Sequence, residues 1–95
     1  MILGSLRIRL YLRDSHSLKE KRSVIRSLIQ NVRNKFNVSV SEVDFQDVWQ
    51  TAEVGVAAVG SDTPFVREVL THVEGYVRYF GGVEVTDVHA ETFGD

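Results

Sequence analysis

The sequence predicts an α+β fold on the strength of three patterns. Four segments alternate apolar and polar residues with the two-residue period of a strand, and two longer segments carry apolar residues at helical spacing. They follow one another as strand, helix, strand, strand, helix, strand. That order is typical of the ferredoxin-like split β-α-β sandwich (βαββαβ), a four-stranded antiparallel sheet with two helices on one face. We expect residues 1–95 to form a single domain of this type.

The first strand and the first helix are the clearest elements. In residues 5–12, Leu and Ile at even positions alternate with Ser, Arg and Tyr at odd positions, so one face is expected to be buried. Residues 17–20 (SLKE) form a capping box, which predicts the start of a helix. Apolar residues at helical spacing extend this helix over 18–36, and Asn37 suits a left-handed stop.

The rest of the chain supplies three strands and the second helix. Residues 38–43 predict a short strand, 44–50 a connection and 51–60 the third strand. The second helix starts at residues 61–64 (SDTP) and carries an apolar stripe until Gly81-Gly82. The last strand covers residues 83 to about 93, and its alternation slips between Val85 and Val88, as a β-bulge would cause.

Chain direction places three connections at one end of the sheet. The loop after the first strand, the loop between the second and third strands, and the Gly81-Gly82 turn share this end if both crossovers are right-handed. Segments 13–22 and 44–50 should therefore be spatial neighbours, although they are distant in sequence.

Composition argues against several classes of function. The absence of cysteine excludes disulfides, thiolate metal sites and cysteine nucleophiles. No apolar run approaches the roughly 20 residues that cross a bilayer, and no signal-peptide pattern is present, so we expect a cytoplasmic protein without membrane contact. The three histidines lie on three elements without ligand spacing, and Asp14-Ser15-His16 are sequence neighbours that rarely reach triad geometry. We expect no enzyme, no cofactor and no metal.

Four sequence segments resemble a known family. They are SLKEKR at 17–22, FNVSVSEV at 36–43, DVWQ at 47–50 and VGVA at 54–57, and together they are similar to the YlxP-like family of small bacterial domains of unknown function. The resemblance implies a ferredoxin-like fold. Genes of the family often lie beside those of transcription and translation factors, which implies association with RNA or the ribosome. It implies no catalytic residue.

Basic residues concentrate in the first part of the chain. Nine of the eleven Lys and Arg residues and only two acids lie in residues 1–36. Helical spacing puts five polar side chains on one side of the first helix, with no acid among them: Lys19, Arg22, Arg26, Gln30 and Arg33. This flank could bind the phosphates of RNA. Alternatively, it is a solvated face whose arginines pair with acids of neighbouring elements.

The end of the sheet where 13–22 meets 44–50 is the second candidate. Lys21 and Arg22 are expected on opposite flanks of the helix stripe, with their charged ends reaching the sheet end beside Trp49. Asp44 and Asp47 come from the other loop. The arrangement is either a binding surface or a structural latch, in which Arg22 or Lys21 pairs with Asp47 and Trp49 covers the core edge.

The sheet face away from the helices is the third candidate. It should carry Arg7, Arg9 and Tyr11 beside Gly55, Ala57 and Val59 of the third strand. Because the third strand has no aromatic residue, base stacking of the RNA-recognition type is not favoured. Small apolar residues there suit a second protomer or another partner chain.

The leading hypothesis is a non-enzymatic binding module. It would engage RNA or a ribosome-associated protein through the first helix and adjoining loops. The alternative is a protein-interaction or homodimerisation module that uses the open sheet face, and a third reading is an anion sensor at the sheet end.

Overall fold

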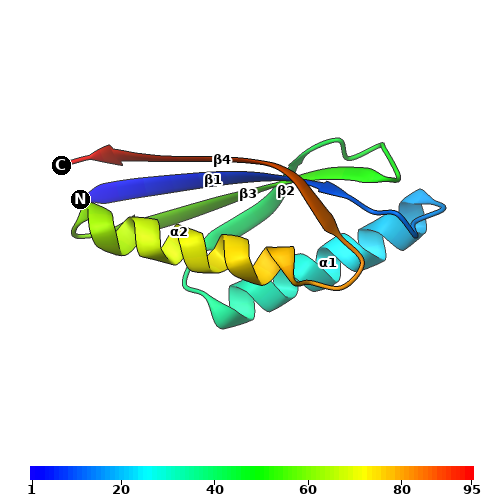
Figure 1. Cartoon of the computed structure of the whole chain (residues 1–95), viewed down its shortest axis with the longest axis horizontal. Coiled ribbons are helices and arrows are strands. Elements are labelled where there is room, and N and C mark those ends of the chain that lie inside the picture. Colours follow the sequence, from blue (N-terminus) through cyan, green and yellow to red (C-terminus); the bar gives the residue numbers. More distant parts are fainter.

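The computed structural model describes residues 1–95 and contains the expected elements in the expected order. They are β1 (Ile2–Tyr11), α1 (Leu18–Lys35), β2 (Ser39–Asp44), β3 (Thr51–Gly60), α2 (Thr63–Arg78) and β4 (Glu84–Gly94). The strands form one antiparallel sheet in the order β2-β3-β1-β4. Both helices lie on one face of this sheet (Figure 1). The predicted ferredoxin-like α+β sandwich is confirmed.

Strand register divides the sheet into a buried face and an outer face. Ile8 is paired with Val54 and Leu6 with Val56, and these side chains are buried under the helices. Arg7 is opposite Gly55 on the other face. The predicted alternation along the two central strands is therefore correct, and it gives one core of 17 buried apolar residues.

The two ends of α1 differ in how well the sequence predicts them. The Ser17 hydroxyl accepts a hydrogen bond from the Glu20 N–H at 3.1 Å, as the capping box requires. At the other end, the prediction that Asn37 ends the helix in a left-handed conformation is wrong. The helix ends instead at Phe36, which is extended (φ −126°, ψ 146°) and donates its N–H to the Val32 carbonyl.

The predicted bulge in the last strand is present. The pairing of β1 with β4 shifts between Arg9, opposite Asp87, and Leu10, opposite Val85. Thr86 is thus the extra residue, and its hydroxyl donates to the Arg9 carbonyl at 3.3 Å. Because a bulge bends its strand, β4 has its regular, straight part after this point.

A glycine sets the distance between α2 and the sheet. Gly4 of β1 is buried on the helix-covered face, and a methyl group there would collide with the side chains of Val66 and Leu70. Residue 4 therefore lets α2 pack directly on β1, and α2 keeps Val73 and Val77 buried along the same side.

Val73→Ala should lower the free energy of unfolding by about 1.5–3 kcal/mol, because Val73 is fully buried and its truncation leaves a cavity. Glu68→Ala on the exposed side of α2 should change it by about 0.5 kcal/mol or less. Urea denaturation of both variants checks this. Equal losses would contradict the packing of α2 described here.

Candidate functional site

Segments 13–22 and 44–50 meet at one end of the sheet, as predicted from chain direction. The Leu12 N–H donates to the Gln50 carbonyl at 2.9 Å, and the Gln50 side-chain amide donates to the Ser15 carbonyl at 3.3 Å. The rings of His16 and Trp49 lie with their centroids 6.4 Å apart. The loop after β1 and the connection between β2 and β3 therefore form one continuous surface.

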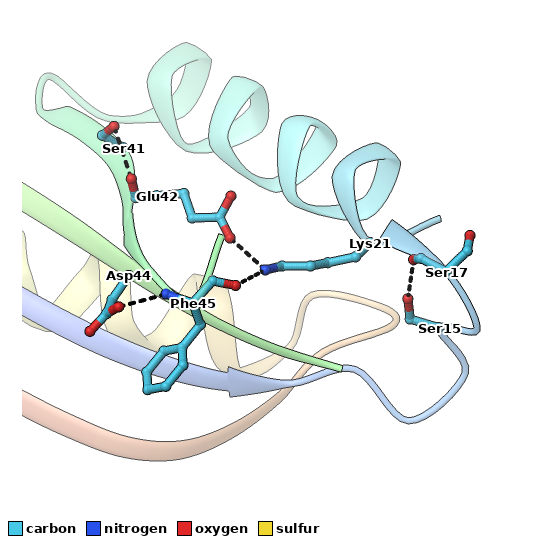
Figure 2. Close-up of polar contacts among 7 residues, drawn as sticks. All are labelled: Ser15, Ser17, Lys21, Ser41, Glu42, Asp44 and Phe45. Carbon is cyan, nitrogen blue, oxygen red and sulfur yellow. Dashed lines mark hydrogen bonds and ion pairs between the residues drawn. The ribbon is translucent and has the colours of Figure 1, made fainter. Parts of the chain in front are cut away.

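Lys21 lies inside this end of the molecule. Its side chain points from the first turn of α1 toward the sheet, and the residue is 0% exposed. Its ammonium donates to the Phe45 carbonyl and forms an ion pair with Glu42, with Nζ and Oε2 2.8 Å apart (Figure 2). A buried charge requires such partners. We call Lys21, Glu42 and Phe45 the Lys21 latch.

The latch corrects two expectations. Lys21 cannot offer its charge to RNA or another partner, because it is buried and paired. A latch at this position was one of the two alternatives, but its acid is Glu42 rather than Asp47.

A sequence signal for this pair existed. Lys21 precedes Ile25, Leu28 and Val32 at helical spacing, and Glu42 faces the helices opposite Val54. A charge at an apolar position indicates that each side chain points toward the core, although the sequence does not show that these two side chains meet.

Phe45 is the conformational exception in the chain. It is the only non-glycine residue with a positive φ, at 62°, a conformation that costs of order 1–3 kcal/mol. Two side chains hold it: the Asp44 carboxylate accepts its N–H at 2.7 Å, and Lys21 donates to its carbonyl (Figure 2). Its ring lies 4.9 Å from the Arg9 guanidinium carbon. The strained residue thus connects α1 to the outer face of the sheet.

The predicted basic flank is present on the surface of α1. Lys19, Arg22, Arg26 and Arg33 are all exposed and lie along one side of the helix with Gln30. Only Arg33 has a fixed contact, in which Nη2 donates to the Val40 carbonyl at 3.0 Å. The pairing of these arginines with acids of neighbouring elements, part of the alternative reading, is wrong, because none of the four cations forms an ion pair; the face is solvated, as that reading also expected.

Unpaired cations are concentrated on α1. Four of the eleven Lys and Arg residues form ion pairs with acids, through Glu53, Glu84, Glu42 and Glu74. Five of the remaining seven belong to α1. The seven are Arg7, Lys19, Arg22, Arg26, Arg33, Lys35 and Arg67.

The outer sheet face is less open than the sequence suggests. Arg9 pairs with Glu53 at 3.1 Å, and the Val43 side chain covers Gly55, where an added Cβ would lie 2.8 Å from Val43 Cγ1. Because Val43 of β2 covers Gly55, and Arg9 is held by Glu53 of β3 and by the Phe45 ring, these two residues are poor candidates for a flat interface. Ala57 and Arg7 remain exposed, and Tyr11 is half-buried.

An apolar row that the sequence analysis missed lies at the opposite end of this face. Leu3 of β1 is paired with Val59 on one side and with Phe93 on the other. The three side chains are 43%, 57% and 46% exposed, respectively. Alternation alone places them on the outer face, but their alignment across three strands depends on register.

Trp49 is 44% exposed, so it covers the core edge only in part. The Ser15 hydroxyl, in the loop after β1, donates to the Ser17 carbonyl at 3.2 Å. No group of three or more His, Asp or Glu side chains is arranged to hold a metal ion. No helix has the length and apolar character needed to cross a membrane.

Two comparisons define the family. Residues 3–90 match the family described as "Protein of unknown function (DUF503)". The chain is 41% identical over 80 residues to "Uncharacterized protein YlxP" of Bacillus subtilis (strain 168), covering 84% of this chain and 87% of that protein. The chain therefore belongs to the DUF503 family, and the resemblance to YlxP is confirmed.

The fold also occurs in a solved structure of unrelated sequence. "De novo designed protein Foldit4" superimposes with a TM-score of 0.51 at 14% identity, covering 99% of this chain and 97% of that one. This likeness concerns the fold alone.

Lys21→Ala should destabilise the fold by about 2–4 kcal/mol, because it leaves the Glu42 carboxylate and the Phe45 carbonyl without their partner. Replacing both members, Lys21→Met with Glu42→Leu, should recover part of this loss. Lys19→Ala, in the same helical turn but exposed, should cost about 0.5 kcal/mol or less. Thermal and urea denaturation measure all three, and a Lys21 variant as stable as the Lys19 variant would contradict the latch.

Proposed function

We propose that this protein is a non-enzymatic RNA-binding module that contacts phosphates through the basic flank of α1. The observation that carries the proposal is the distribution of unpaired cations. Five of the seven Lys and Arg residues without an acidic partner lie on this helix, and its one acid, Glu20, accepts a hydrogen bond from the His16 N–H.

Electrostatics explains why such a flank favours a polyanion. Exposed like charges at three- and four-residue spacing repel one another by a few tenths of a kcal/mol per pair. A phosphate backbone removes this repulsion and releases its own counterions. Lys19 and Arg33 are separated by about 21 Å along the helix axis, so the flank can follow several consecutive phosphates.

The surroundings of the flank add to the proposal. Arg33 is held in place by the Val40 carbonyl, which limits the side-chain entropy that binding would cost. Trp49, half-exposed at the sheet end, offers a ring for stacking on an unpaired base. We place this activity in the cytoplasm, with RNA or a ribosome-associated protein–RNA surface as the partner.

Arg22→Gln combined with Arg26→Gln should weaken binding of a labelled RNA stem-loop, measured by fluorescence anisotropy over a salt titration. Both side chains are exposed and unpaired, so folding should not change. The slope of log K against log salt should fall by about two units, one for each phosphate contact removed.

The matched control is Arg7→Gln with Lys35→Gln. It removes the same charge from two exposed cations without acidic partners that lie off the flank, on β1 and on the opposite side of α1, where Lys35 Nζ is 5.7 Å from the centroid of the Tyr76 ring. Its salt slope should equal that of the wild type. Equal slopes for both double variants, or no binding by the wild type at low salt, would show that the flank is not an RNA site.

The second candidate function is a protein-interaction or homodimerisation module that uses the outer sheet face. The exposed row of Leu3, Val59 and Phe93 supports it, since aligned apolar side chains of this size favour burial by a partner. Under this alternative, Val59→Lys would abolish complex formation while leaving RNA binding intact.

A further inference from the structure

The two edges of the sheet are not equivalent. The β2 edge is only six residues long, and its pairing with β3 shifts between Glu42 and Asp44. The β4 edge is 11 residues long, and its one register shift, at Thr86, lies near its start. It contains no proline, lysine or arginine, which are among the residues that commonly protect an edge strand. Figure 1 shows β4 along the outside of the sheet beside β1, and its outer side carries no other strand.

The helix-covered side of β4 is also incompletely covered. Val88 and Thr92 are half-buried there and Ala90 is exposed, because the outermost strand extends beyond the cover that α2 provides. A groove of about 250 Å³ runs between Ala90 and Thr92 on the strand and Leu70 and Thr71 on the helix. The edge and the groove form one unfilled surface.

We infer that β4 pairs with β4 of a second copy of this chain, so that two sheets join into one antiparallel sheet of eight strands. The two copies would be related by a two-fold axis through Ala90. Such an isologous contact requires the same surface to be complementary to itself, and the charges on both layers meet this requirement.

The strand layer fixes the register of the pairing. The bulge at Thr86 leaves residues 87–94 as the straight part of β4, so pairing centred on Ala90 uses nearly all of it. This register puts His89 opposite Glu91 of the partner, and both side chains lie on the outer face. Within one chain, Nε2 of His89 and Oε1 of Glu91 lie at hydrogen-bond distance, 2.7 Å apart. Pairing centred on His89 would instead place Asp87 opposite Glu91 of the partner. Pairing centred on Glu91 would place the two Glu91 side chains opposite each other. Both registers would bring like charges together.

The helix layer is complementary about the same point. Arg67 and Glu74 of α2 both line the groove, one on each side of Leu70 and Thr71. A two-fold axis beside Leu70 and Thr71 makes α2 antiparallel to α2 of the second copy. It places Arg67 opposite Glu74 of the partner. Arg67 has no acidic partner within the chain, whereas Glu74 already pairs with Arg78 of the same helix at 3.0 Å and would contact an arginine on each side. The centre of the helix pairing, at Leu70 and Thr71, and the centre of the strand pairing, at Ala90, lie beside each other, since all three residues line one groove.

Sedimentation equilibrium of variants with reversed charges at residues 67 and 74 tests the proposed dimer. Wild type should give the mass of a dimer. Arg67→Glu and Glu74→Arg should each give a monomer, because each places two pairs of like charges across the interface. An equimolar mixture of the two variants should regain the dimer mass, since only a mixed pair restores both attractions. Circular dichroism of each variant should match the wild type, because Arg67 is exposed, Glu74 is outside the buried core, and the contact that Glu74→Arg removes within the chain is a single ion pair with Arg78.

Ala90→Asp supplies a second perturbation on the strand layer. Ala90 is exposed within one chain, so the fold should persist, but in the dimer two carboxylates would be directly opposite each other. The control is Ala57→Glu on the outer face of β3, which should remain a dimer. A monomeric wild type at every concentration overturns the inference. So does a dimer that survives Ala90→Asp and both charge changes, or one that only Ala57→Glu dissociates.

Discussion

The buried contact between Lys21 and its two partners is the constraint on which this end of the molecule depends. It links the first turn of α1 to the end of β2 through Glu42 and to the β2–β3 connection through Phe45. An unpaired ammonium at this depth would be strongly unfavourable, so the helix, the strand and the loop must come together in one arrangement. The positive φ of Phe45 is tolerated for the same reason, because hydrogen bonds from both sides hold that residue. The Phe45 ring then lies beside Arg9 and closes that part of the outer face.

The latch also explains why the basic flank is free for binding. Among the cations of α1, Lys21 serves the fold and is neutralised inside it, whereas Lys19, Arg22 and Arg26 extend into solvent without acidic partners. Adjacent residues on the helix therefore have separate roles, one structural and three available to a ligand. Apart from Arg33, which also donates to the Val40 carbonyl, the flank consists of side chains without a structural contact, so variants at Arg22 and Arg26 can report binding without altering stability.

The flank and the β4 edge lie on different parts of the molecule. In the strand order β2-β3-β1-β4, α1 packs chiefly on β2, whereas the proposed self-association uses the opposite edge. Pairing through β4 would keep the helices of both copies on one side of the joined sheet. A dimer of this kind would present two basic flanks at its ends, and two linked sites increase avidity on a polyanion. The two proposals can still fail independently, because each rests on its own surface.

The sequence alone determined the element order, the buried alternation of the central strands, the Ser17 cap and the bulge near Thr86. These follow from periodicity and from contacts within a few residues, so local physics is sufficient for them. It also determined that segments 13–22 and 44–50 meet, because handedness leaves few topologies. Only the tertiary structure decided which acid neutralises Lys21, that Phe45 has a positive φ, and which arginines lack an acidic partner. Each of these depends on contacts between residues far apart in the chain: Lys21 and Phe45 are 24 residues apart, and Arg9 and Glu53 are 44 apart. Charge pattern along the chain does not determine which of several nearby acids will lie within reach.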